Sequence, residues 1–216
     1  VPGAVAGMAM ALHEYGTMTL AQVMAPAIKL ASDGFVVDSA LSEAVNGAAK
    51  LIKPFDGAAL FFPGENAIAP GTRLVQPDLA RTLGLIAKEG PAGFYKGAVA
   101  DSFAAEQRRD KGIITKTDLA NYKAISRKPV IGTYRGDTVI SMPPSSSGGI
   151  TAIESLNILE TWPKLPPFGS TGYVHDVAEA FRLAFIDRNT LLGDPAFVKV
   201  PMEHLISKAY ADTLRK

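Results

Sequence analysis

The sequence lacks cysteine altogether and has no excess of charge of either sign. None of its 216 residues is a cysteine, so disulfide scaffolds, thiolate metal sites and cysteine nucleophiles are excluded. The 22 lysines and arginines almost balance the 21 aspartates and glutamates, whereas a nucleic-acid-binding domain normally shows a strong basic excess. No apolar run approaches the ~20 residues needed to cross a bilayer. The sequence therefore indicates no nucleic-acid partner and no membrane span.

What the chain does contain is typical of a folded protein. Hydrophobic residues make up 47% of it and charged residues 20%, which excludes a disordered chain. It opens on Val1-Pro2-Gly3, without an initiator methionine, and closes on Leu214-Arg215-Lys216 within a helical pattern. We therefore expect both ends to be truncated or processed.

Capping residues and glycine punctuation predict mostly helices in the first half. Thr19 and Gln22 match a capping box, and Gly34 stands where the helix that they begin should end. Asp38 or Ser39 is expected to cap the next helix. Residues 54–71 are predicted to form a loop.

A β-hairpin is predicted in the second half. Residues 130–134 and 138–142 are rich in β-formers and are joined by Arg135-Gly136-Asp137. Helices follow, and the last long one has an apolar stripe made of six residues: Val174, Val177, Ala178, Phe181, Ala184 and Phe185. So few strands cannot cover these helices, which suggests that a partner segment supplies the missing strands.

The histidines do not form a metal site in the sequence. His13, His175 and His204 lie far apart, without a metal ligand at helical spacing, and the chain contains no HExxH motif and no EF-hand loop. Surface or helix-capping roles are the favoured interpretation for each histidine. We expect no metal and no cofactor.

The loop PPSSSGG at residues 143–149, between a predicted strand and a predicted helix, is the strongest candidate for a binding or catalytic site. Ser146 and Ser147 offer hydroxyl donors, and Gly148 and Gly149 let backbone N–H groups converge at a helix start, where a carboxylate or an oxyanion binds favourably. The competing interpretation is a plain connection that uses serine as N-cap and glycine for close packing. The residues alone do not separate the two.

A second set of charged residues lies near the end of the last long helix. Arg182, Asp187 and Arg188 could face a substrate, but a salt-bridge network that holds a helix end is favoured. No local spacing pairs a nucleophile with a base, so motifs alone predict no mechanism.

Several segments, taken in chain order, resemble the γ-glutamyltranspeptidase family. The resemblance covers essentially the whole chain, with one departure: the family's usual third proline in the PPPSSGG block is Ser145 here. The segments are residues 1–7, 25–35, 76–83, 93–97, 118–122, 142–149 (MPPSSSGG) and 179–195.

This resemblance implies an N-terminal-nucleophile hydrolase, which is an α+β fold built as a four-layer αββα sandwich. Residues 1–216 would be part of the large subunit of that single domain, and a small subunit cut from the same precursor would complete the sheets. The small subunit's N-terminal threonine would attack a γ-glutamyl amide such as glutathione, and water or an amino acid would accept the acyl group. The family is typically periplasmic or extracellular.

No catalytic residue of the family maps onto this chain. The threonine and the oxyanion-hole glycines belong downstream of Lys216, and the arginine for the substrate carboxylate belongs upstream of Val1. Ser146, Ser147, Gly148 and Gly149 remain the substrate-binding candidates. A cephalosporin or glutaryl acylase of the same family is the first alternative function. A non-catalytic carboxylate-binding module is the second.

Overall fold

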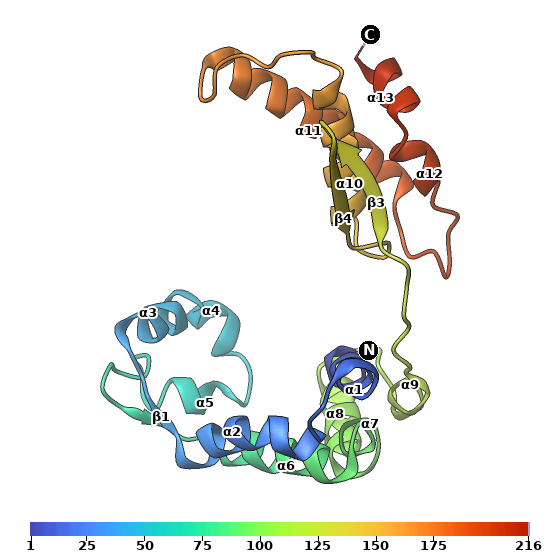
Figure 1. Cartoon of the computed structure of the whole chain (residues 1–216). Coiled ribbons are helices and arrows are strands. Elements are labelled where there is room, and N and C mark those ends of the chain that lie inside the picture. The colour runs from blue at the N-terminus through green and yellow to red at the C-terminus, as the bar shows by residue number, and fades with distance from the viewer. Residues whose placement is uncertain (216) are drawn as a thin grey trace. The chain divides into compact units, whose positions relative to one another are not determined.

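The computed structural model describes residues 1–215 as two compact units, one formed by Val1–Ile125 and the other beginning at Ser126 (Figure 1). The expectation that the C-terminal end is truncated includes Lys216, and this residue lies outside the described residues.

The N-terminal unit is almost entirely helical. Two short strands, β1 (Phe35–Val36) and β2 (Arg73–Leu74), pair antiparallel with Phe35 opposite Leu74. The helices are α1 (Ala4–Tyr15), α2 (Leu20–Asp33), α3 (Ser39–Gly47), α4 (Ala49–Ile52), α5 (Ala58–Phe61), α6 (Pro77–Glu89), α7 (Ala92–Tyr95), α8 (Gly97–Arg109) and α9 (Lys116–Asn121).

Local capping explains where several of these helices begin. The Thr19 hydroxyl accepts the Gln22 N–H at 3.3 Å, and the Gln22 side chain accepts the Thr19 N–H at 2.8 Å, so the predicted capping box is confirmed. Asp38 caps α3 through the Leu41 N–H at 2.8 Å, as expected. The predicted loop 54–71 was wrong in part, because α5 forms within it.

A buried tyrosine ties the start of α1 to α7. The Tyr95 hydroxyl donates to the Pro2 carbonyl at 2.8 Å and accepts the Ala6 N–H at 3.3 Å. Its ring stacks on Tyr122, with 5.5 Å between the ring centroids. Two distant parts of the unit are therefore held by one side chain whose polar group is fully used.

The C-terminal unit combines one hairpin with four helices. Strands β3 (Val130–Tyr134) and β4 (Asp137–Ser141) pair antiparallel, with Ile131 opposite Ile140, so the predicted hairpin is confirmed to within one residue. The helices are α10 (Gly148–Glu160), α11 (Thr171–Leu191), α12 (Met202–Leu205) and α13 (Lys208–Leu214). The mixture of many helices with small sheets confirms the predicted α+β class.

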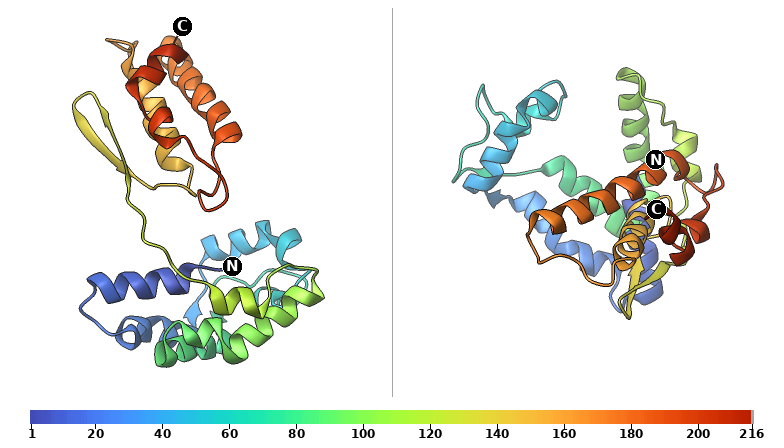
Figure 2. Two further views of the ribbon diagram at one scale, coloured as in Figure 1. Left: turned by 90° about the vertical axis from the view of Figure 1, so that its right-hand side faces the viewer. Right: turned by 90° about the horizontal axis from the view of Figure 1, so that it is seen from above.

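Helix α10 forms the centre of this unit, and the hairpin lies along it (Figures 1 and 2). Ile150 and Ile153 are fully buried and form a core with Val130 and Leu205. At Gly132 an added Cβ would stand only 2.5 Å from Ile153 Cγ2, so glycine is what allows β3 to approach α10 this closely.

The predicted apolar stripe of α11 was wrong in part: Ala184 is buried and Val177 packs against a buried cluster, but the two phenylalanines are not covered. Phe181 and Phe185 are each 48% exposed, whereas the buried residues of the helix are Ala180, Ala184 and Asp187. The large apolar side chains therefore lie beside the packed face rather than on it. The small side chains of Ala180 and Ala184 allow α11 to lie close to α10.

Replacing Ile153 by alanine should lower the free energy of unfolding by about 2–5 kcal/mol, because the side chain is fully buried in the core and leaves a cavity. Lys164→Ala, at an exposed position of the same unit, is the matched control and should change stability by less than about 0.5 kcal/mol. Urea unfolding of the two variants measures the difference. Equal small effects would contradict the position of the core.

Candidate functional site

The predicted loop connects the end of β4 to the start of α10. Pro143 and Pro144 lack N–H donors, so the β ladder cannot continue through them. The helix begins at Gly148, with Ser147 as its N-cap, and the Ser147 side chain makes no capping hydrogen bond. The four candidate residues 146–149 thus lie together at a helix N-terminus, where the helix dipole favours negative charge.

Gly149 performs a packing function within this loop. It is buried, and a Cβ added to it would stand 2.2 Å from the carbonyl oxygen of Met142. No side chain fits at that distance. Glycine is therefore required for the loop to fold back against the start of α10.

Ser146 and Gly148, in contrast, lie on the outside. Both are exposed, and the Ser146 hydroxyl accepts the Gly148 N–H at 3.4 Å. A Cβ added to Gly148 would meet only Ser146 Oγ, at the ordinary contact distance of 3.6 Å. The two interpretations of the loop thus apply to different residues: Gly149 serves packing, and the outer residues are accessible to a ligand.

Ser147 is held by an arginine from α11. Arg188 Nε donates to Ser147 Oγ at 3.0 Å, and the guanidinium lies 5.5 Å from the centroid of the Phe185 ring. A hollow of about 300 Å³ lies beside the prolines of the same loop. Its lining residues are Arg127, Lys128, Pro143, Pro144, Pro195, Val200 and Met202.

The favoured salt-bridge network among Arg182, Asp187 and Arg188 was wrong. Within residues 1–215 no ion pair joins Asp187 to either arginine: Arg182 pairs with Glu179 at 2.7 Å, and Arg188 reaches Ser147. Asp187 is 9% exposed and accepts the Tyr210 hydroxyl proton instead.

A buried carboxyl pair lies behind the loop, and sequence reasoning missed it. Tyr210 donates its hydroxyl proton to Asp187 Oδ2 at 2.6 Å, and Glu154, 1% exposed, lies near Asp187. Burial, together with the nearby Asp187, raises the pKa of Glu154 to about 9. Burial also raises the pKa of Tyr210 to about 12. The position of Glu154 one turn after the buried Ile150 was the available signal.

The three histidines are all exposed, at separate positions. Over the described part of the chain, no group of three His, Asp or Glu side chains is placed to hold a metal ion. No helix in that part is long and apolar enough to span a bilayer.

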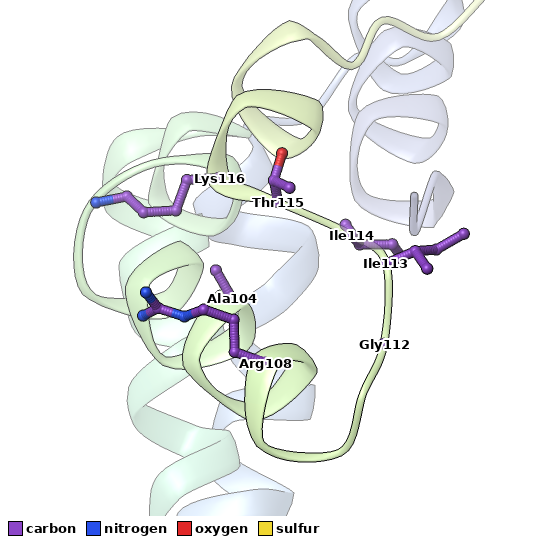
Figure 3. A pocket seen from close by; sticks show the side chains of 7 residues that line it. All are labelled: Ala104, Arg108, Gly112, Ile113, Ile114, Thr115 and Lys116. Carbon is purple, nitrogen blue, oxygen red and sulfur yellow. The ribbon is translucent and has the colours of Figure 1, made fainter.

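The N-terminal unit has a hollow of its own, of about 250 Å³ (Figure 3). Arg108 and Lys116 lie on one side of it, and Ile113 and Ile114 lie on the other. Lys116 is already paired with Asp101, so the hollow is less suited to an anion than two cationic side chains would suggest.

Paired glycine substitutions test the division of roles within the loop. Gly149→Ala should lower the free energy of unfolding by about 1–3 kcal/mol, because the new methyl group overlaps the Met142 carbonyl. Gly148→Ala has free space and should leave stability unchanged or raise it by up to about 1 kcal/mol, since alanine favours the helix. Urea unfolding measures both. Equal losses would show that Gly148 is packed as well.

Comparison with known proteins identifies relatives over the whole chain. The chain is 47% identical over 216 residues to the glutathione hydrolase proenzyme of Escherichia coli K12. This match covers 99% of the present chain but 37% of that relative. It is 45% identical over 217 residues to the acylase ACY 1 proenzyme of Pseudomonas sp. strain V22, with coverage of 100% and 39%. The chain thus spans well under half the length of these relatives.

The fold agrees with these matches. The crystal structure of Helicobacter pylori gamma-glutamyltranspeptidase superposes with a TM-score of 0.94 at 42% identity, over 100% of this chain and 62% of that one. A family model described as gamma-glutamyltranspeptidase matches residues 1–216. The resemblance predicted from the sequence segments is confirmed, and the chain belongs to the gamma-glutamyltranspeptidase family.

Proposed function

We propose that this chain is part of the large subunit of a γ-glutamyltransferase/hydrolase that cleaves γ-glutamyl amides such as glutathione. The observation that carries the proposal is the match of the family over the entire chain, together with the backbone similarity to a gamma-glutamyltranspeptidase. Within this proposal, residues 1–216 are one part of a single αββα domain.

The nucleophile belongs to a second chain, the small subunit cut from the same precursor. Its N-terminal threonine hydroxyl attacks the γ-carbonyl carbon of the substrate, and the threonine α-amine takes up the hydroxyl proton. Backbone N–H groups stabilise the oxyanion, and the C–N bond then breaks as the departing amine is protonated. Water hydrolyses the resulting ester, or an amino acid takes over the acyl group.

Exposed apolar side chains on the hairpin favour the proposal that a partner chain covers this surface. On the hairpin, Ile131 and Ile140 lie directly opposite each other and are 55% and 66% exposed, and Met142 beyond β4 is 65% exposed. Neighbouring exposed apolar residues of this kind mark surfaces that another protein segment covers. A small subunit that adds strands over the hairpin fits this surface, and also explains the scarcity of strands.

The loop of residues 146–149 is the part of this chain that we place against the substrate. Ser146 and Gly148 are exposed at the start of α10, and the positive end of the helix dipole favours a carboxylate there. No cofactor and no metal takes part in the proposed chemistry. The proposed location is periplasmic or extracellular, in keeping with the family.

An acylase that cuts a glutaryl or cephalosporin side-chain amide is the second candidate. The near-equal identity to an acylase proenzyme favours it, and the same threonine chemistry would serve. A module that binds a carboxylate without turnover is the remaining alternative. It has neither a threonine-initiated partner nor turnover.

The purified protein should contain a second chain that begins with threonine, and should hydrolyse a chromogenic γ-glutamyl anilide faster than a glutaryl-cephalosporin. Intact mass, N-terminal sequencing and parallel rate measurements check these outcomes. Preference for the glutaryl substrate would identify the acylase. Absence of any threonine-initiated chain would contradict the enzyme proposal.

Replacing Gly148 by valine should lower activity more than stability, because the β-branched side chain would project from the exposed start of α10 toward the substrate. The matched control is Gly57→Val, at an exposed glycine with free space in the other unit, which should leave turnover unchanged. Steady-state kinetics and thermal unfolding measure both variants. Parallel losses of activity and stability at Gly148 would favour a purely structural loop.

A further inference from the structure

Helix α10 carries polar side chains into the interior of its unit. Thr151, Glu154 and Asn157 succeed one another at intervals of three residues, and none is more than 6% exposed. Each has an oxygen without a hydrogen-bond partner among the described residues: Thr151 Oγ1, Glu154 Oε1 and Asn157 Oδ1. Burial of a polar oxygen without a hydrogen-bond partner is costly, which makes these three positions candidates for a functional role.

A second carboxyl group meets Glu154 in this interior. Asp187 of α11 is 9% exposed and accepts the Tyr210 hydroxyl proton at 2.6 Å from α13, and it lies near enough to Glu154 to raise the pKa of that carboxyl group. Burial and the negative charge of a nearby carboxylate both favour the protonated form of a carboxyl group. Glu154, whose pKa is raised to about 9 by its burial and by Asp187, is therefore expected to hold a proton at neutral pH.

The residue after Asp187 connects this interior to the loop. Arg188 extends toward the N-terminus of α10, where its Nε donates to Ser147 Oγ at 3.0 Å. Asp187 and Arg188 are adjacent on one turn of α11, so whatever fixes the Asp187 side chain also fixes the point from which Arg188 reaches the loop.

We propose that Glu154, Asp187 and Tyr210 form a carboxyl network that positions Arg188 against Ser147 and so maintains the shape of the substrate-facing loop. In this arrangement protonated Glu154 and the Tyr210 hydroxyl both donate to the Asp187 carboxylate. Arg188 is a positioning residue that acts through Ser147. This inference rests on the proposed function only in that the loop contacts substrate.

The titratable groups near Glu154 and Tyr210 belong to three helices. Asp187 faces Glu154 from α11 and Tyr210 faces it from α13, and the His204 ring of α12 lies tilted against the Tyr210 ring, with 4.2 Å between the ring centroids. The cation nearest in sequence to Tyr210, Lys208, is engaged elsewhere by Glu160 and by the Thr133 carbonyl.

The sign of the pH dependence follows from the raised pKa. The folded chain holds the Glu154 proton up to about pH 9, whereas the unfolded chain releases it near its ordinary value of 4.5. The stabilisation is therefore fully present below pH 4.5 and is lost progressively as pH rises to about 9.

The first test compares the purified full-length protein with E154Q, whose amide can still donate to Asp187 but cannot titrate. Unfolding of the native protein should release about one proton more than unfolding of E154Q over the pH range of about 5 to 9, measured from the pH dependence of the unfolding free energy. Identical pH dependence would overturn the network. Infrared spectroscopy of the native protein needs no variant: a protonated carboxyl band should be present at neutral pH and lost above about pH 9. Its absence at neutral pH would equally overturn it.

The second test concerns positioning. R188Q should raise KM for a γ-glutamyl anilide about tenfold with kcat nearly unchanged, because a charge-assisted hydrogen bond to the loop is lost. R188K retains a donor and should recover most of the affinity. The matched control R182Q, which removes an exposed pair with Glu179 on the same helix, should leave KM unchanged. Unchanged KM in R188Q would overturn the positioning role. If the native protein shows no turnover at all, the proposed function fails, while the proton measurements still decide on the carboxyl network.

Discussion

The burial of α10 on nearly every side is the constraint on which the rest of the C-terminal unit depends. The hairpin, α11, α12 and α13 all contact this helix, and its buried residues include Gly149 in the first turn and Leu159 near the end. A helix packed on most of its circumference cannot shift or rotate without disturbing its neighbours. The loop before it is therefore placed by core packing, and Gly149 allows the close approach to Met142.

The same burial shapes the electrostatics behind the loop. Glu154 lies on the buried side of α10 near Asp187, and this burial together with Asp187 raises its pKa to about 9. Arg188 then lies where it can bind Ser147. Packing, a retained proton and the conformation of a candidate binding loop are thus connected through α10 and α11.

The membership of the gamma-glutamyltranspeptidase family gives these features a common setting. This chain spans 37% of its relative from Escherichia coli, and its hairpin presents Ile131 and Ile140 outward. A sheet of two strands does not by itself enclose a core. A single proposed partner chain would therefore both cover the apolar outer face of the hairpin and carry the nucleophile.

Local sequence by itself determined the features that depend on near neighbours. The capping box at Thr19, the hairpin around Gly136 and the start of α10 after Ser147 were predictable, because each needs only residues within a few positions. The resemblance of segments in chain order also identified the family. Only the tertiary structure decided which face of α11 is buried, that Gly149 packs while Gly148 is exposed, and that Glu154 meets Asp187. These depend on contacts between residues far apart in the chain, and a carboxylate or a phenylalanine on a helix has no local pattern that tells which neighbour will cover it.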